Sequence, residues 1–284
     1  MNIGLVGSSG YIANFLFETL EKETNVKNIV KIDLSDEADI FLNLLSPENF
    51  NYELLDNIDI VIFTAAISSP DQCAVEFETC WKINVIGTSY FIKKAIEHNC
   101  KVLFFSSDAV FGNISDKIYT EKSETKANTA YGKMKKEIED LFKNEPNFKA
   151  IRLSYVVSKK DKFVSYCLDC IKENKIAEIF HPFYRNCITI SQVMNVVQWL
   201  INHWDKYEPF VLNVAGQELV SRVRIADEIN RLYGSKLNYI ISKPSKKFYE
   251  NRPQITQMKS LYLEKYEILE QSTFTENLQR EWGK

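Results

Sequence analysis

Three residues in the first half of the chain have side chains suited to proton transfer at a carbonyl or alcohol group. Tyr131 and Lys135 lie four positions apart in the stretch YGKMK, so a helix there places both side chains on one face. An ammonium group beside a phenol stabilises the phenolate, so we expect Lys135 to lower the pKa of Tyr131. Ser107 ends an apolar stretch, where its hydroxyl could hold a substrate oxygen. Because this spacing also arises by chance, these three residues indicate a catalytic site only if the surrounding strands and helices place them together.

A turn containing two glycines opens the chain in the stretch IGLVGSSGYIANFLF (residues 3–17). In a dinucleotide-binding turn, the first glycine permits the bend, the second lets the chain approach the pyrophosphate, and the third packs helix on strand. Gly7 and Gly10 match the first two, and Ala13 replaces the third, which this motif admits. Phosphates would lie at the helix N-terminus, where free N–H groups and the helix dipole favour anions. The turn predicts a nucleotide cofactor, although such a turn can also simply join a strand to a helix.

An acidic residue follows the glycine turn at the distance that dinucleotide binding requires. Asp33 lies 23 residues after Gly10, at the end of the strand-like stretch NIVKID. An acid at this place can hydrogen-bond both hydroxyls of the adenosine ribose and repel the 2′-phosphate of NADP. The alternative is an aspartate that caps the next turn. We therefore predict NAD as the cofactor, with NADP as the second option.

Apolar strand-like runs alternate with helical segments through the first half of the chain, and this alternation determines the predicted fold. The predicted strands cover residues 2–6, 28–33, 59–66, 101–107 and 149–157. The main helices between them cover residues 74–98 and 129–142. The pattern predicts an α/β fold with a Rossmann-type doubly wound parallel sheet.

After residue 157, predicted strands and helices no longer alternate regularly. Helices are predicted over residues 163–173, 191–204 and 224–233, with a strand over 210–216 and an irregular stretch HPFYRNCITI between them. We expect residues 1–157 to form an NAD(P)-binding Rossmann domain, joined by the helix near 190–204. Residues 158–284 would mainly form a smaller carboxyl-terminal substrate-binding domain.

Composition argues against several other classes of protein. The 35 basic and 38 acidic residues give a net charge of −3, so we expect no nucleic-acid partner. The amino terminus lacks the pattern of a signal peptide and no apolar stretch reaches membrane-spanning length, so we expect a cytoplasmic protein with no membrane partner. Six scattered cysteines and three distant histidines predict reduced, mostly buried thiols and no metal site.

Taken in order, these motifs resemble the extended short-chain dehydrogenase/reductase family, over nearly the whole chain. The stretches KINVIGT, FFSSDAVFG and IRLSYVV are similar to segments of its cofactor-binding half. The stretches FYRNCITISQV, LNVAGQELVSRVRIADEI and ENRPQITQM are similar to its sugar-nucleotide-binding half. In length and carboxyl-terminal motifs, the chain most resembles the dTDP-4-dehydrorhamnose reductases and neighbouring sugar-nucleotide epimerases.

The resemblance implies a role for each matching position. The implied catalytic residues are Ser107, Tyr131 and Lys135. The implied cofactor-binding residues are Gly7, Gly10, Tyr11, Ile12, Asp33, Asp39, Ile40, Thr64, Ala65, Ala66, Asn84, Ser106, Tyr131 and Lys135. The implied substrate-binding residues are Asp108, Arg185 and Arg252, and no metal is implied.

Some of these roles have plain structural alternatives. Asp39 and Ile40 would border the adenine, and Asn84 would support the site, although an asparagine on a helix can equally face solvent. Arg185 and Arg252 would meet the nucleotide diphosphate, and each could instead be a surface arginine.

The leading functional expectation is an oxidoreductase that reduces a keto group of a nucleotide-activated sugar. An NAD-dependent epimerase with tightly bound cofactor would use the same catalytic residues, and a non-catalytic member that senses NAD or binds a partner is the alternative of another class. Dehydration is disfavoured, because the family's dehydratases carry an acidic pair where this chain has Asp108 and Ala109. The apolar segment 81–96 is compatible with a homodimer and equally with burial inside one subunit.

Overall fold

The computed structural model describes residues 1–112 and 117–283, and the chain divides into two compact units. The first unit consists of Met1–Gly112, Thr125–Arg152 and Val197–Leu212. The second unit consists of Asn113–Glu124, Leu153–Val196 and Asn213–Lys284. The assignment of a cofactor-binding role to one part of the chain and a substrate-binding role to the other stays a prediction.

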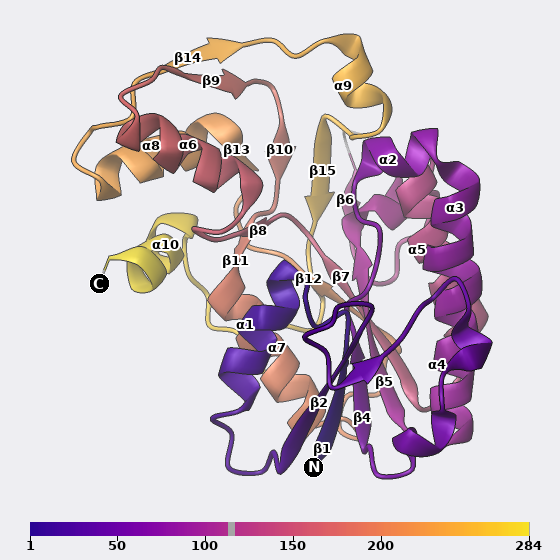
Figure 1. Cartoon of the computed structure of the whole chain (residues 1–284). Coiled ribbons are helices and arrows are strands. Elements are labelled where there is room, and N and C mark those ends of the chain that lie inside the picture. The colour runs from indigo at the N-terminus through magenta and orange to yellow at the C-terminus, as the bar shows by residue number, and fades with distance from the viewer. Residues whose placement is uncertain (113–116, 284) are drawn as a thin grey trace. The chain divides into compact units, whose positions relative to one another are not determined.

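The first unit is built on a seven-stranded sheet with the strand order β12-β7-β5-β4-β1-β2-β3 (Figure 1). Its strands are β1 (Asn2–Val6), β2 (Asn28–Asp33), β3 (Ile40–Phe41), β4 (Ile60–Phe63), β5 (Lys101–Ser107), β7 (Phe148–Leu153) and β12 (Val211–Val214). β1 pairs in parallel with both β2 and β4, which continue in parallel to β3 and β5. β2 and β3 follow on one side of β1, and β4 and β5 follow on the other. The carboxyl ends of β1 and β4 therefore form the switch point where such sheets bind ligands. The predicted Rossmann-type fold is confirmed.

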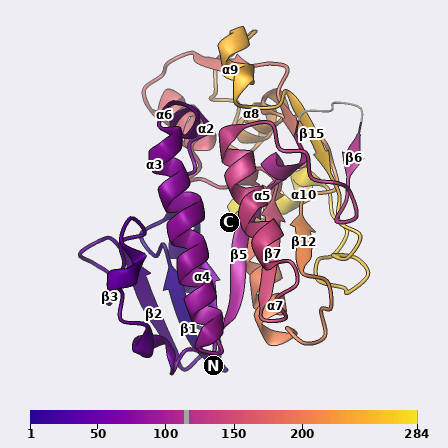
Figure 2. The ribbon, with the colours of Figure 1, turned by 90° about the vertical axis from the view of Figure 1, so that its right-hand side faces the viewer.

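Helices cover both faces of this sheet. Those preceding β7 are α1 (Tyr11–Leu20), α2 (Pro70–Val75), α3 (Phe77–Trp81), α4 (Thr88–Glu97) and α5 (Ala130–Phe142), with 3-10 turns at Pro47–Asn49, Tyr52–Leu55 and Asp108–Phe111. Figure 1 shows α1 on one face of the sheet and α4 and α5 on the other, and Figure 2 shows α4 and α5 side by side in front of the sheet. Phe63 of β4 packs against Phe91 and Phe104, with ring centroids 5.8 and 6.1 Å apart, so the core lies between the sheet and α4.

The helix predicted over residues 74–98 is interrupted in the structure. Glu76 departs from helical geometry (φ −106°, ψ 44°) and separates α2 from α3, and a π-helical turn (Lys82–Gly87) precedes α4. Gly87 lies so close to the backbone of Leu44 that an added Cβ would stand 1.9 Å from the Leu44 carbonyl oxygen. The helix therefore adapts its winding where it packs against the loop that contains Leu44.

The second unit contains short sheets and the remaining helices. Its strands are β6 (Ile118–Tyr119), β8 (Val156–Val157), β9 (Ala177–Phe180), β10 (Tyr184–Arg185), β11 (Ile188–Thr189), β13 (Val220–Ser221), β14 (Tyr239–Ser242) and β15 (Ile255–Met258). Its helices are α6 (Lys162–Lys172), α8 (Arg222–Leu232), α9 (Lys246–Glu250) and α10 (Phe274–Trp282), and α7 (Ile190–Asn202) continues into the first unit. Apolar faces of α6, α8 and α10 meet in its core, through side chains such as Val164, Ile229 and Leu278.

Two predictions for this region are wrong in detail. The strand expected over residues 149–157 ends at Leu153, and β8 pairs with β11 instead of extending the large sheet. The stretch HPFYRNCITI, expected to be irregular, contains β10 and β11. Both errors have the same cause, because strands of two residues are specified by pairing partners distant in sequence and not by a local pattern.

All six cysteines are buried and none is joined in a disulfide, so their expected burial is confirmed. Among the described residues, no group of three or more His, Cys, Asp or Glu side chains could hold a metal ion. No helix within the described ranges has the length and apolar character needed to cross a membrane.

Candidate active site

The turn after β1 requires glycine at its first position. Gly7 has φ +83°, in the left-handed region, and an added Cβ would stand 2.5 Å from the Ala65 backbone nitrogen. Its N–H donates to the Ile32 carbonyl at 2.9 Å. Thr64 Oγ1 donates to the carbonyl oxygens of Val6 and Gly7 at 2.8 and 3.2 Å. Thr64 and Ala65, both predicted to line the cofactor, therefore lie directly against the turn.

The N-terminus of α1 is arranged to receive an anion. Gly10 is its N-cap, and in the described structure neither a side-chain cap nor an acidic residue occupies the first turn. A Cβ added to Gly10 would meet only the Gly7 carbonyl oxygen, at 3.0 Å, and Ala13 is fully buried against the core. Helix N–H groups left without side-chain partners bind phosphates well, so this turn fits a dinucleotide pyrophosphate. The contacts expected of Tyr11 and Ile12 stay predictions.

Asp33 is bonded to the glycine turn. Its Oδ2 accepts hydrogen bonds from the backbone N–H and the hydroxyl of Ser9, at 2.8 and 2.9 Å. Its Oδ1 accepts from the N–H groups of Leu34 and Ser35, at 2.6 and 3.3 Å. The acid therefore does cap the turn that follows β2, and it also places a negative charge beside the glycine turn, where a 2′-phosphate would be repelled.

Asp39 and Ile40 lie at the edge of the sheet beyond β2. Asp39 is exposed, and its Oδ2 accepts a hydrogen bond from the Lys31 N–H at 2.8 Å. Ile40 is half-buried and begins β3. The carboxylate of Asp39 thus stabilises the sheet edge, and the adenine contacts of both residues stay predictions.

The three expected catalytic residues lie on adjoining elements of the first unit. α5 carries Tyr131 and Lys135 on one face, with Lys135 Nζ 5.8 Å from the Tyr131 ring centroid. Gly132 packs tightly on the turn after β5, since an added Cβ would stand 2.3 Å from the Ala109 carbonyl oxygen. Ser107 ends β5, and its hydroxyl oxygen accepts from the Ala109 N–H at 3.2 Å. The close approach of α5 to this turn brings the tyrosine next to the serine segment.

The predicted lowering of the Tyr131 pKa is wrong for this arrangement. Burial raises the pKa of Tyr131, and the neighbouring Cys73 thiol and Asp108 carboxyl act in the same direction. The Ser107 hydroxyl donates to Asp108 Oδ1 at 3.1 Å, which holds that carboxylate at the turn. Because desolvation is the largest influence on this phenol, Tyr131 keeps its proton at neutral pH and is suited to act as an acid.

Lys135 is buried and directed toward the sheet. Its Nζ donates to the Phe105 carbonyl oxygen at 2.7 Å and lies 4.4 Å from the Phe104 ring centroid. Burial lowers the pKa of Lys135 to about 7, although Glu139 acts in the opposite direction. Near neutral pH, Lys135 is therefore present in both its protonated and its neutral form, as expected of a group at a reactive site.

A buried network, which the sequence analysis did not anticipate, supports this lysine. Glu139, one helical turn after Lys135, pairs with Arg152 of β7 at 2.6 Å, and the Ser106 hydroxyl donates to the same carboxylate at 2.5 Å. The network joins α5 to β5 and β7, and Ser106 directly follows Phe105, whose carbonyl holds Lys135. The Ser106 hydroxyl is used here, and the cofactor contact predicted for Ser106 stays a prediction.

Asn84 faces the interior of the unit. It is 3% exposed, which rules out the solvent-facing alternative. Its Oδ1 accepts from the Ile67 N–H at 2.8 Å, and its Nδ2 donates to the Ile67 carbonyl at 2.9 Å. Both bonds fix the loop after β4, directly beyond Thr64, Ala65 and Ala66.

The two arginines expected to meet a diphosphate belong to the second unit. Arg185 is 8% exposed and donates to the carbonyl oxygens of Tyr184 and Pro253, each at 2.6 Å. The Cζ of Arg252 lies 5.1 Å from the Phe248 ring centroid. Arg185 is therefore no surface residue, and the diphosphate contacts of both arginines stay predictions.

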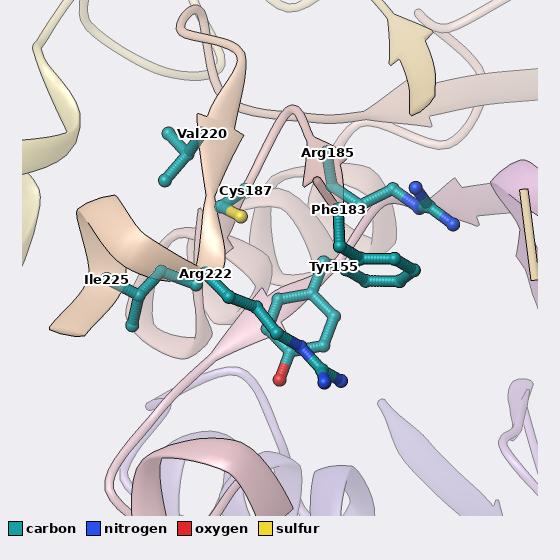
Figure 3. Close-up of a pocket in the computed structure, with 7 residues that line it drawn as sticks. All are labelled: Tyr155, Phe183, Arg185, Cys187, Val220, Arg222 and Ile225. Carbon is teal, nitrogen blue, oxygen red and sulfur yellow. The ribbon is translucent and has the colours of Figure 1, made fainter. Parts of the chain in front are cut away.

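A small pocket in the second unit contains another arginine, which the sequence analysis did not identify as a site residue. The pocket measures about 10 Å³ and is lined by Tyr155, Phe183, Arg185, Cys187, Val220, Arg222 and Ile225 (Figure 3). Arg222 is the first residue of α8, and it shares the helix face of the buried residues Ile225, Ala226 and Ile229. Arg222 could have been identified from the sequence, because it is a charged residue among the apolar residues of one helix face. Glu139 is likewise a charged residue beside the buried Ile138 and Phe142.

Comparison with known proteins places these observations in a family. The family described as RmlD substrate binding domain matches residues 1–282. A dTDP-4-dehydrorhamnose reductase of Aggregatibacter actinomycetemcomitans is 28% identical over 139 residues, which are 48% of this chain and 45% of that protein. The spore coat polysaccharide biosynthesis protein SpsK of Bacillus subtilis (strain 168) is 33% identical over 85 residues, 30% of each chain. The chain thus spans less than half the length of the curated relatives it matches.

Solved structures agree with the fold over the whole chain. A dTDP-4-dehydrorhamnose reductase from Yersinia enterocolitica has a TM-score of 0.85 at 23% identity and covers 99% of this chain and 98% of its own. The corresponding Bacillus anthracis enzyme in complex with NADP has a TM-score of 0.81 at 18% identity, with 99% and 98% covered. MoeE5 in complex with UDP-glucose and NAD has a TM-score of 0.80 at 17% identity, with 100% and 98% covered.

Proposed function

We propose, from the premise that the chain belongs to the RmlD substrate-binding-domain family, that it is an NAD(P)-dependent oxidoreductase acting on a nucleotide-activated sugar. The reaction we propose is reduction of a 4-keto-deoxyhexose, by likeness to the reductases that it resembles. The observation that carries the proposal is the presence, in one compact unit, of the glycine turn with its acid and of the Ser107–Tyr131–Lys135 set. Such a set can transfer a proton to or from a carbonyl or alcohol that changes its oxidation state.

The cofactor we propose is NAD, held at the turn after β1. The uncapped N-terminus of α1 would receive the pyrophosphate, and Asp33 would face the adenosine ribose. When bound, the nicotinamide supplies or accepts the hydride. NADP occurs in one related structure and NAD in another, so the negative charge of Asp33 is the reason for preferring NAD here.

Residues of the chain itself would supply the proton to the keto oxygen of the sugar. Tyr131 holds its proton at neutral pH because burial raises its pKa, so it can donate that proton to the keto oxygen of the sugar. The Ser107 hydroxyl would hold the same oxygen in place. The Lys135 ammonium would stabilise the phenolate that Tyr131 becomes after donating, and its bond to the Phe105 carbonyl fixes its position.

The test is substitution of the proposed acid. We expect Tyr131→Phe to abolish reduction of nucleotide keto-sugars while NAD(H) binding, measured by fluorescence titration, stays within twofold of the unmodified protein. Tyr90→Phe, which removes a hydroxyl from an exposed tyrosine of the same unit, should leave turnover unchanged. Retained turnover in Tyr131→Phe would show that another group supplies the proton.

We also propose a cytoplasmic protein that forms a homodimer. Six free thiols are typical of a reducing compartment. Large apolar side chains are exposed on α2 to α4, namely Val75 (84%), Ile86 (55%), Tyr90 (39%) and Phe77 (37%). Pairing of these helices between two copies would cover them. Light scattering after size exclusion should give twice the chain mass, and a monomer at micromolar concentration would contradict the dimer.

A further inference from the structure

Two sulfur-containing side chains meet an amide group in the interior of the first unit. Cys73 of α2 and Met134 of α5 are both fully buried, and Asn84 of the π-helical turn is 3% exposed. Asn84 Nδ2 donates to Met134 Sδ at 3.5 Å and to Cys73 Sγ at 3.9 Å. We call Cys73, Asn84 and Met134 the sulfur–amide cluster, in which three elements distant in sequence meet.

The backbone of Ile67 is held by this cluster. Its carbonyl oxygen accepts hydrogen bonds from Asn84 Nδ2 at 2.9 Å and from the Cys73 thiol at 3.2 Å. Its N–H donates to Asn84 Oδ1 at 2.8 Å. A carbonyl oxygen has two lone pairs and a residue has one N–H, so the two side chains satisfy both polar groups of the Ile67 backbone.

The loop that leads to Ile67 begins against the glycine turn. Thr64 Oγ1 donates to the Gly7 carbonyl oxygen at 3.2 Å, and a Cβ added to Gly7 would stand 2.5 Å from the Ala65 nitrogen. Only Ala66 separates these contacts from Ile67. One short loop therefore has its first residues at the predicted cofactor turn and its fourth residue at the sulfur–amide cluster.

The cluster also belongs to the surroundings of the proposed catalytic residues on α5. Met134 lies three positions after Tyr131, so the two side chains share a helix face, and Met134 directly precedes Lys135. Burial raises the pKa of Tyr131 and lowers that of Lys135, and the neighbouring Cys73 thiol acts on both groups. The sulfur–amide cluster thus connects the loop after β4 to the helix that carries the proposed acid.

A protonated thiol suits the position of Cys73. Burial raises the pKa of this thiol, and the neighbouring Cys80 acts in the same direction, so Cys73 keeps its proton at neutral pH and can donate it in a hydrogen bond. A thiol is also a small apolar group that fits a core. Loss of the thiol would leave the Ile67 carbonyl with one of its two side-chain donors.

We infer that Cys73 and Met134 are positioning residues, which together with Asn84 hold the loop predicted to line the cofactor against α5. The inference rests on the cofactor-binding part of the proposed function. Cys73 acts through the Ile67 backbone on cofactor affinity, and Met134 acts through α5 on the placement of the proton donor.

The first experiment measures NADH binding by fluorescence titration and the thermal midpoint in matched thiol variants. Cys100 is the control, because it is also fully buried and its thiol donates to the Ile58 carbonyl oxygen at 3.3 Å, directly before β5 and therefore at the opposite end of that strand from Ser107. We expect Cys73→Ala to weaken NADH binding at least fivefold. Cys73→Ser, whose hydroxyl can donate to the same carbonyl, should bind NADH within twofold of the unmodified protein.

The control separates positioning from packing. Cys100→Ala should lower the thermal midpoint about as much as Cys73→Ala and leave NADH affinity within twofold, because both changes remove a buried thiol. Should Cys73→Ala not fold, Cys73→Val provides the measurement, since it fills the space without supplying a donor.

The second experiment tests the contact with α5. Met134→Leu conserves the volume of the side chain and removes the sulfur that accepts from the Asn84 amide. We expect kcat for reduction of a nucleotide keto-sugar to fall at least threefold, while NADH affinity and the KM of the sugar stay within twofold. A smaller fall in kcat would overturn the role of Met134.

The outcomes separate the inference from the proposed function. If Cys73→Ala binds NADH as well as Cys100→Ala does, or if Cys73→Ser fails to recover the affinity, the role of Cys73 is wrong and the proposed function stands. If the unmodified protein binds NADH but reduces no nucleotide keto-sugar, the proposed substrate and the role of Met134 are overturned, and the binding data still decide the role of Cys73. If the unmodified protein binds neither NADH nor NADPH, the inference and the proposed function are both overturned.

Discussion

Glu139 and Arg152 form a bidentate ion pair in the interior of the first unit. Nε and Nη2 of Arg152 donate to the carboxylate at 3.0 and 2.6 Å, and the two side chains are 3% and 4% exposed. Removing one partner of such a pair leaves an uncompensated buried charge, which costs about 3–5 kcal/mol. We therefore expect Glu139→Gln to lower the free energy of unfolding by about that amount, measured by urea denaturation.

Replacing both partners by apolar residues separates the stability of the pair from its effect on the site. The double variant Glu139→Leu/Arg152→Met should recover most of the lost stability, because no charge remains buried. It should still have reduced kcat, because the Ser106 hydroxyl loses its acceptor and the strand segment that holds Lys135 is no longer anchored. A double variant with normal kcat would show that the network contributes only to folding.

Gly7 and Gly234 allow the effect of backbone strain to be separated from that of a close contact. Both have positive φ, +83° and +68°, but an added Cβ meets the Ala65 nitrogen at 2.5 Å at Gly7 and nothing within 4 Å at Gly234. Gly234→Ala should cost about 1–2 kcal/mol from conformation alone. Gly7→Ala should cost more than Gly234→Ala and weaken NAD(H) binding at least tenfold. Equal losses of stability in chemical denaturation would contradict the close packing of the turn.

The negative charge of Asp33 should determine the choice between NAD and NADP. Asp33→Asn keeps an acceptor for the Ser9 N–H and removes the charge that repels a 2′-phosphate. We expect the ratio of kcat/KM for NADPH to that for NADH to rise about tenfold, which corresponds to about 1.4 kcal/mol. Asp36→Asn, at an exposed acid in the next turn, is the matched control. An unchanged ratio in Asp33→Asn would place the discrimination elsewhere.

Two buried lysines predict how stability depends on pH. Burial lowers the pKa of Lys135 to about 7 and that of Lys149 to about 8, from 10.5. Between these values and 10.5 the unfolded chain binds more protons than the folded one, so the free energy of unfolding should rise with pH. The penalty for burying the ammonium groups is fully present below pH 7 and is relieved as pH increases.

The check is urea denaturation between pH 6.5 and 9. Lys135→Met and Lys149→Met should each reduce the rise in the free energy of unfolding across this range. The exposed Lys133→Met should leave it unchanged. A free energy of unfolding that falls over the same range in the unmodified protein would contradict the lowered pKa values.

The sequence by itself determined the features that depend on local pattern. β1, β2 and β5 were predicted with the boundaries observed, and for β1 and β5 the reason is that apolar runs buried on both faces leave a continuous signal. The helix carrying Tyr131 and Lys135 was predicted within one residue, since Thr129 caps it through the Gly132 N–H and its apolar stripe is regular. The alternation of apolar strands with helices was sufficient to predict the fold, and the spacing of the glycine turn, Asp33, Ser107 and the YxxxK motif indicated the family.

Only the tertiary structure decided how these residues act on one another. That burial raises the pKa of Tyr131 depends on side chains brought from α2 and the turn after β5, which spacing along the chain does not reveal. The pairing of Glu139 with Arg152 and the gathering of Arg222 with Arg252 around Phe248 join residues 13 and 30 positions apart. Charge compensation and desolvation are properties of a folded neighbourhood, so the sequence could name the groups but not their protonation or partners.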